Sequence, residues 1–200
     1  MRFIPVGGDA LLVEVTDVAQ ATALFAEARR RDVDAVDVVP GARTVLFDGV
    51  RDLAGLVDGI RSWSPGPPGA ESRRRVDVPT RYDGEDLAAV ARMWDMTTRE
   101  VVQTHTSCDM VVAFCGFAPG FAYCTGLPAA LEVSRLDSPR SSVPAGSVAL
   151  AGEFTGVYPQ SSPGGWRLIG RTDLKLWDET MEEPATLSPG TPVRFVEVSA

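Results

Sequence analysis

Histidine and cysteine are scarce in this sequence, which has one histidine and three cysteines in 200 residues. The cysteines, Cys108, Cys115 and Cys124, form no CxxC pair, and their number is odd. Zinc sites combine several Cys and His ligands at close spacing, so we expect no metal site in this chain. Reduced thiols are the simplest prediction for the three cysteines.

Long apolar runs and an excess of positive charge are also missing. No apolar run approaches the roughly 18 residues of a membrane-spanning helix, and the N-terminus MRFIPVGGDALLVEV lacks the features of a signal peptide. We therefore expect a cytoplasmic protein with no membrane partner. The net charge of −8 opposes binding to nucleic acid. The basic cluster at residues 73–75 is interpreted as part of a solvated linker, with a nucleic-acid arm as the alternative.

Two common catalytic motifs are absent as well. The sequence has no GxxxxGK[ST] phosphate-binding loop, and Lys175 is its only lysine. Ser147, in AGSVAL, lacks the flanking glycines of the G-x-S-x-G nucleophile elbow. A Ser-His-Asp hydrolase is therefore not expected.

The first part of the chain has the pattern of a small α/β domain. A hydrophobic content of 44% is enough for a real core, in one ordinary domain or two small ones. Asp17 is a plausible cap for a helix with apolar residues on one face. The predicted elements are strands 2–6 and 10–15, a helix from residue 17, strands 33–39 and 43–49, and a helix over 52–63. The order ββαββα predicts an open sheet with helices on one face.

A segment rich in Gly, Pro and charge, residues 64–75, separates this part from the rest. It predicts a linker with a domain boundary near residue 70, and thus domains at 1–70 and 71–200.

The second part has two short helical patterns and then many short strands. Thr97 and Glu100 have the spacing of a capping box for the helix TTREVVQTH. The predicted elements are strand 76–84, helices 86–94 and 97–105, strand 110–117, and closing strands at 174–178 and 191–199. This order predicts a β-barrel-like domain decorated by helices.

Residues 116–171 hold nearly half of the chain's 19 glycines and 15 prolines, alternating with apolar runs. Short strands joined by demanding turns are the simplest interpretation. A merely flexible segment would not need the six aromatic residues found there, so we expect this stretch to form the wall and rim of the barrel and to carry the function.

Four motifs in this stretch resemble one known family. They are GFAPGFAY (116–123), SPR (138–140), VPAGSVALAG (143–152) and YPQSSPGGWRLIGRT (158–172). In this order they are similar to the family of 5-oxoprolinase B subunits, also called allophanate hydrolase subunit 1, which includes the KipI kinase inhibitor. Weaker matches lie at residues 8–11, 86–87 and 105–106.

The resemblance implies an α+β protein, with a small α/β N-terminal domain followed by a cyclophilin-like β-barrel. It implies one part of a complex that also contains a companion C subunit (KipA-like, or allophanate hydrolase subunit 2) and an A subunit, and that opens 5-oxoproline to glutamate with ATP. In urea-processing enzymes the same module serves as a carboxyltransferase domain. The partner subunits would supply much of the ATP site. The alternatives are a regulatory protein that inhibits a sensor histidine kinase and, more weakly, a prolyl isomerase.

His105, the only histidine, is the candidate catalytic residue, because it matches a family position and imidazole titrates near neutrality. The alternative is a helix-ending histidine bonded to a backbone carbonyl. Arg140 and Arg171 are candidate substrate-binding residues, because an arginine fork binds carboxylate or phosphate. The alternative for both is the satisfaction of backbone carbonyls in loops.

The turn at 116–121 is the third candidate. Glycines there allow close approach of a ligand, and an exposed aromatic side chain can anchor a partner. The alternative is that its phenylalanines simply plug the barrel end. For the segment 163–166, a turn followed by a core tryptophan is favoured over a stacking platform. The candidate substrate-binding residues of the turn are Gly116, Phe117, Pro119, Gly120 and Phe121.

Overall fold

The computed structural model describes residues 1–64 and 74–199. The chain divides into two compact units, residues 1–72 and 73–200, each with a hydrophobic core of its own. The predicted boundary near residue 70, most of the predicted linker and Arg73 lie outside the described residues. No helix in the described part of the chain is both long and apolar enough to cross a membrane.

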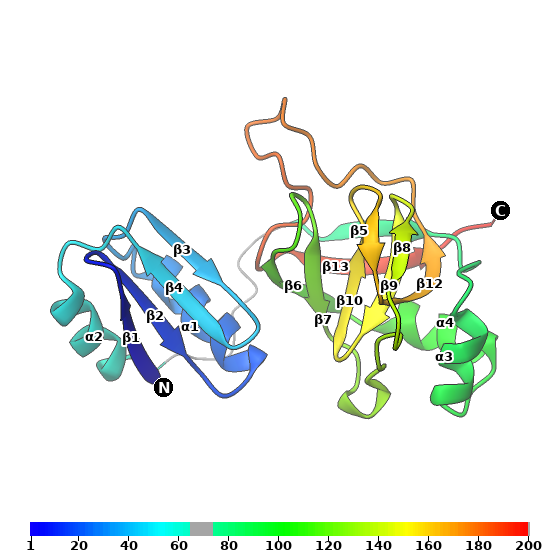
Figure 1. Cartoon of the computed structure of the whole chain (residues 1–200), viewed down its shortest axis with the longest axis horizontal. Helices are drawn as coiled ribbons and strands as arrows, with labels where there is room; N and C mark the ends of the chain where they lie inside the picture. The colour runs from blue at the N-terminus through cyan, green and yellow to red at the C-terminus, as the bar shows by residue number, and fades with distance from the viewer. Residues whose placement is uncertain (65–73, 200) are drawn as a thin grey trace. The chain divides into compact units, whose positions relative to one another are not determined.

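The first unit is a four-stranded antiparallel sheet with its helices on one face (Figure 1). The strand order is β1, β2, β4, β3. Alternate residues of the central strands, such as Val13 and Phe47, are fully buried in one cluster with Leu24 and Ile60 of the two helices. The elements are β1 (Arg2–Val6), β2 (Ala10–Glu14), α1 (Val18–Arg30), β3 (Asp37–Pro40), β4 (Thr44–Asp48) and α2 (Leu53–Ser62).

The predicted ββαββα order is confirmed, and so is the cap: the side chain of Asp17 accepts a hydrogen bond from the N–H of Gln20. The strand predicted over 33–39 begins only at Asp37. Residues before it form a turn, in which the N–H of Ala35 donates to the carbonyl of Val33 at 2.8 Å. The prediction from the apolar alternation of that segment therefore placed the start of the strand too early.

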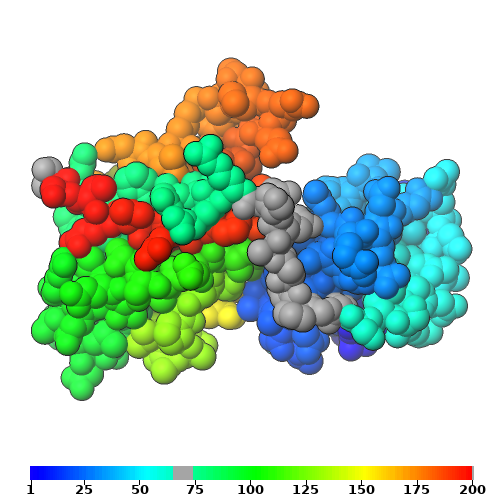
Figure 2. Space-filling model, turned by 180° about the vertical axis from the view of Figure 1, so that it is seen from behind, coloured from blue at the N-terminus to red at the C-terminus, as the bar shows by residue number. Residues whose placement is uncertain are grey.

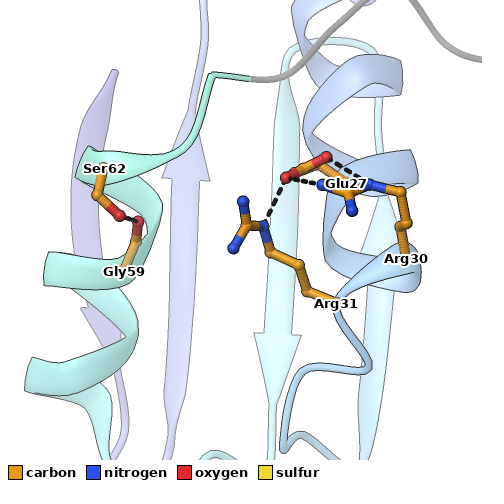
Figure 3. Close-up of polar contacts among 5 residues, drawn as sticks. All are labelled: Glu27, Arg30, Arg31, Gly59 and Ser62. Carbon is orange, nitrogen blue, oxygen red and sulfur yellow. Dashed lines mark hydrogen bonds and ion pairs between the residues drawn. The ribbon is translucent and has the colours of Figure 1, made fainter.

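The end of α1 contacts the end of α2 through Arg31, whose guanidinium is held by a buried carboxylate. Glu27 is only 8% exposed, and it accepts hydrogen bonds from Arg30 and Arg31 (Figure 3). These hydrogen bonds hold the pKa of Glu27 below its usual value. The guanidinium of Arg31 also lies 5.1 Å above the ring of Trp63, which directly follows α2. The contact between Arg31 and Trp63 thus fixes the two helices against each other.

The second unit is built on a seven-stranded barrel-like sheet, in the order β12-β9-β10-β7-β6-β13-β5. Strand β13 pairs in parallel with β5, and the other pairs are antiparallel. A small two-stranded sheet, β11-β8, lies beside it. The strands are β5 (Val76–Thr80), β6 (Met110–Cys115), β7 (Ala122–Thr125), β8 (Arg140–Val143), β9 (Ser147–Ala151), β10 (Phe154–Val157), β11 (Ser162–Gly164), β12 (Arg167–Arg171) and β13 (Pro192–Glu197). The predicted α+β fold with a barrel is confirmed.

Three short helical segments accompany these strands: α3 (Leu87–Met93), α4 (Thr98–Ser107) and the single 3-10 turn η1 (Ala129–Leu131). Helix α4 packs against β13 and α3 against β12. The predicted capping box is confirmed, since Thr97 accepts from the N–H of Glu100 and the Glu100 carboxylate accepts from the N–H of Thr97.

The barrel closes where the chain after β5 meets β12. Arg81 and Arg171 exchange two backbone hydrogen bonds of 2.9 Å, and the N–H of Gly84 donates to the carbonyl of Ile169 at 3.2 Å. This seam explains a wrong prediction. Residues 174–178 do not form a strand apart from an isolated bridge at Trp177, because the edge of β12 is already occupied.

The lack of a side chain at Gly84 helps the seam to close. A Cβ placed on Gly84 would lie 2.4 Å from the carbonyl carbon of Ile169, which is backbone and cannot rotate away. We therefore expect Gly84→Ala to lower the free energy of unfolding by about 3 kcal/mol, the cost of overpacking a rigid site. Urea denaturation measures it. Gly8→Ala is the control, because nothing lies within 4 Å of that position. Equal denaturation midpoints for the two variants would contradict this account of the seam.

Candidate binding site

The turn between β6 and β7 has strained backbone. Phe117 has a positive φ of 68°, which side-chain-bearing residues rarely adopt. The N–H of Ala118 donates to the carbonyl of Gly116 at 2.8 Å, so Phe117 is the centre of a three-residue γ-turn. Gly120, with φ 81°, then brings Phe121 back toward the barrel. Strain of this kind persists where the surrounding structure holds it, and it is concentrated at functional sites.

A small aromatic pocket of about 110 Å³ opens beside this turn. The centroid of the Phe121 ring lies 5.2 Å from that of Tyr158 and 5.3 Å from that of Trp166. The plane of the Phe121 ring is nearly perpendicular to both other rings. Gly164 allows this packing, since a Cβ there would lie 2.2 Å from the Tyr158 hydroxyl oxygen. The lining residues are Phe117, Phe121, Tyr123, Arg135, Tyr158, Pro163, Gly164, Gly165 and Trp166.

Arg135 supplies the positive charge of the pocket. Its guanidinium lies 6.0 Å from the centre of the Trp166 ring and has no carboxylate partner among the described residues. Burial raises the pKa of Tyr123 and of Tyr158, and the charge of Arg135 opposes both shifts. The phenols therefore stay neutral near pH 7. The arrangement suits a small, flat ligand that carries one carboxylate.

The structure brings only part of the predicted site together. Phe117 and Phe121 line the pocket, and Gly116, Pro119 and Gly120 shape the turn beside it. The two phenylalanines differ: Phe121 is 2% exposed and belongs to a buried cluster with Tyr158 and Trp166, while Phe117 is 63% exposed. Segment 163–166 also lines the pocket, and its Trp166 is a buried core residue as well.

Arg140 does not line the pocket, because other groups hold its guanidinium. It donates to the carbonyl of Trp166 at 3.3 Å and forms ion pairs with Glu85 and Asp86. The buried Asp86 carboxylate also accepts from the N–H of Leu168 at 2.7 Å. Arg140 thus ties the start of α3 to β12, and its role in binding substrate stays a prediction.

Removing Arg140 should affect stability more than substrate binding. Arg140→Ala would leave the Asp86 side chain, 10% exposed, without its cation, and we expect a loss of about 3 kcal/mol in the free energy of unfolding. Arg171→Ala is the matched control. Its ion pair with Asp83 is exposed, so a loss below about 1 kcal/mol is expected. Chemical denaturation compares the two. Similar losses, or a large increase in KM with unchanged stability for Arg140→Ala, would contradict this assignment.

Arg171 lies at the far end of β12 from Trp166. It lines a wider groove of about 360 Å³ together with Arg81, Thr172 and Asp173. Arg81 pairs with Asp173, so both arginines of the groove have carboxylate partners. Arg171 is therefore separate from the aromatic pocket, and a substrate-binding role for it also stays a prediction.

His105 is fully buried between α4 and the barrel. Its Nδ1 lies 2.7 Å from the Tyr82 hydroxyl and its Nε2 3.2 Å from the Thr155 hydroxyl, while its ring packs against Phe195. Burial lowers its pKa to about 3, so the imidazole is neutral at physiological pH. Its partners are side chains rather than the backbone carbonyl considered from the sequence. A catalytic role would require the ring to become accessible, and it stays a prediction.

Sequence reasoning missed Arg135, Tyr123 and Tyr158 as pocket residues. Arg135 belongs to none of the four motifs, and Tyr158 meets Phe117 only through the pairing of β10 with β7, which spacing alone does not give. Among the described residues, no group of three or more His, Cys, Asp or Glu side chains is placed to hold a metal ion. The three cysteines are free, and burial raises the pKa of Cys115 to about 11 and that of Cys124 to about 12.

Comparison with known proteins identifies relatives along nearly the whole chain. The family model for the carboxyltransferase domain, subdomain C and D, matches residues 1–187. The 5-oxoprolinase B subunit of Haemophilus influenzae is 35% identical over 207 residues, which cover 98% of this chain and 97% of that protein. The protein of the same name from Escherichia coli O157:H7 is 41% identical over 168 residues, covering 80% and 77%.

Solved structures of other proteins are also similar to this chain over nearly its whole length. The conserved protein PH0987 of Pyrococcus horikoshii superposes with a TM-score of 0.61 at 28% identity, covering 99% of this chain and 98% of its own. The TTHA0988 structure gives a TM-score of 0.78 at 31% identity, covering 96% of this chain but 40% of the longer protein. The urea amidolyase of K. lactis, at 18% identity and a TM-score of 0.68, shares the fold.

Proposed function

The chain belongs to the family of 5-oxoprolinase B subunits, whose members carry the carboxyltransferase domain of subdomains C and D, and we propose that it is one subunit of an ATP-dependent 5-oxoprolinase or of a related amidohydrolase or carboxyltransferase complex. The observation that carries the proposal is the full-length match to a protein named as the B subunit of 5-oxoprolinase, with 97% of that relative covered. In this proposal the aromatic pocket binds the substrate acid.

The size and charge of the pocket support a substrate of this class. A volume of about 110 Å³ is suited to a small molecule rather than to a nucleotide. The lactam ring of 5-oxoproline is nearly flat, so it can lie against the aromatic side chains that line the pocket. Its single carboxylate can pair with the guanidinium of Arg135.

The side chains of the same pocket are not sufficient for the reaction, which favours a role for partner subunits. Hydrolysis of a lactam needs an acid or base that exchanges protons near neutral pH, and ATP use needs a phosphate-binding site. The pocket offers only phenols with raised pKa values, and the one histidine is buried and neutral. In this proposal the chain binds and orients the acid, and the companion C and A subunits supply ATP binding and proton transfer.

The longer TTHA0988 chain is consistent with such an arrangement. This chain spans about two fifths of it, so that relative carries a further part on the same polypeptide. A companion subunit would occupy the corresponding place in a complex made of separate chains.

Reconstitution tests the proposal. The purified chain and the purified C and A subunits are mixed with ATP and 5-oxoproline, and the released glutamate is measured. We expect glutamate release above background only when all three proteins and ATP are present. When this chain is omitted, release is expected to stay at background. Full activity without this chain, or full activity of this chain alone, would contradict the proposal.

A further inference from the structure

The chain between β12 and β13, residues 172–191, forms an ordered arm although it contains no strand. Structureless segments of this length are uncommon in compact domains and usually functional. Leu176 and Leu187, 3% and 1% exposed, anchor its two limbs in the core. The N–H of Thr186 donates to the carbonyl of Leu176 at 3.0 Å, and the N–H of Asp178 to that of Pro184 at 2.9 Å. Figures 1 and 2 show the tip projecting from the barrel.

The arm presents large apolar side chains to solvent, Met181 at its tip and Trp177 near its base. Met181 is 61% exposed and Trp177 is 37% exposed. The base of the arm lies against the strained turn, since a Cβ on Gly120 would be 3.0 Å from the Cβ of Trp177. That turn carries Phe117, which is 63% exposed. Exposed aromatic residues and methionine are typical of the centre of protein interfaces.

Three acidic residues lie next to Met181 in the sequence of the arm. Glu179, Glu182 and Glu183 are exposed and have no ion-pair partner among the described residues. In contrast, Asp178 is paired with Lys175 at 2.7 Å, and its Oδ1 accepts from the N–H of Thr180 at 3.1 Å, which holds the tip in shape. A preformed tip loses little conformational entropy when a partner binds it.

We propose that this arm surface, defined as Phe117, Trp177 and Met181 with Glu179, Glu182 and Glu183, is the docking surface for the companion C subunit. The inference rests on the proposed function and adds the location and chemistry of the contact. The partner presents an apolar depression ringed by Lys and Arg side chains, because those complement the three carboxylates. A second copy of this chain is disfavoured, since a symmetric contact would bring like carboxylates together.

Phe117 belongs both to the arm surface and to the aromatic pocket. Docking of the companion subunit here therefore places its residues beside the mouth of the pocket. This is where the acid or base that the pocket lacks is needed.

Binding of the purified C subunit, measured by calorimetry with wild type and variants, tests the inference. Met181→Ser is expected to weaken binding at least tenfold, and Glu182→Lys/Glu183→Lys about 100-fold with a reversed dependence on salt. The matched controls are Met93→Ser on α3, where Met93 is 45% exposed, and Glu132→Lys/Glu153→Lys near η1. Both controls are expected to bind as wild type does. All altered residues are exposed, so equal melting temperatures are expected.

The binding results distinguish a wrong docking surface from a wrong proposed function. If wild type binds the C subunit and the arm variants bind it equally well, or the controls lose as much affinity, the arm surface is wrong while the proposed function stands. If wild type shows no binding to the C subunit, the proposed function fails together with the inference. Selective loss in the arm variants supports both.

Discussion

Replacing Arg135 by glutamine is expected to raise the KM of the reconstituted complex for 5-oxoproline about 10- to 100-fold, with a smaller change in kcat. Arg135 provides the positive charge of the aromatic pocket, and no described carboxylate competes for it. A charge-assisted hydrogen bond to a substrate carboxylate contributes about 1.5–3 kcal/mol, which corresponds to this range. Steady-state kinetics over a range of 5-oxoproline concentrations measure the change.

Arg167→Gln is the matched control for this prediction. Arg167 is next to Trp166 in sequence, but its guanidinium donates to the carbonyl of Ser134 at 3.1 Å and does not line the pocket. Its loss removes one positive charge from the same region, and KM is expected to change less than about threefold. If both variants raise KM equally, the effect is one of general charge and the pocket is not the binding site.

Acid should destabilise the folded protein through its single histidine. In the unfolded chain His105 has a pKa of about 6.5, and in the folded chain burial lowers it to about 3. Between these values the unfolded state binds the proton and the folded state does not. Stability is therefore full above pH 6.5 and falls as pH decreases toward 3, by up to about 1.4 kcal/mol per unit. At pH 5 the expected loss is about 2 kcal/mol relative to pH 7.

The free energy of unfolding from urea titrations at pH 7 and pH 5 measures this loss. His105→Gln is the comparison, because glutamine can bond to Tyr82 and Thr155 without titrating. This variant is expected to lose less than about 0.5 kcal/mol between the two pH values. The contradicting outcome is equal pH dependence in wild type and variant, which would mean that His105 is accessible to protons in the folded state.

The sequence was sufficient for most of the elements and for the fold class, because local signals and tertiary packing agree there. Asp17 and the pair Thr97 and Glu100 cap the helices where their spacing indicates. The apolar alternation of LKLWD failed, since a strand also needs a free neighbour and the contact between Arg81 and Arg171 already closes that edge. Such competition for an edge depends on pairings far apart in the chain.

The candidate site could be predicted only in part for the same reason. Glycine and aromatic residues marked the turn around Phe117 and the segment before Trp166, because turns are encoded locally. Arg135 comes from a loop with no motif, and it reaches the pocket only through the barrel topology. Burial, which decides the character of His105, also has no local signal: the residue lies in a polar helical sequence, TTREVVQTH, yet is fully enclosed.

The central claim is that the aromatic pocket beside the strained turn binds the substrate acid. A crystal structure of the assembled complex soaked with 5-oxoproline tests it most directly. We expect the ligand ring in the pocket lined by Phe117 and Tyr158, with its carboxylate within hydrogen-bonding distance of the Arg135 guanidinium. Ligand density beside Arg171 or His105, with an empty aromatic pocket, would contradict the claim.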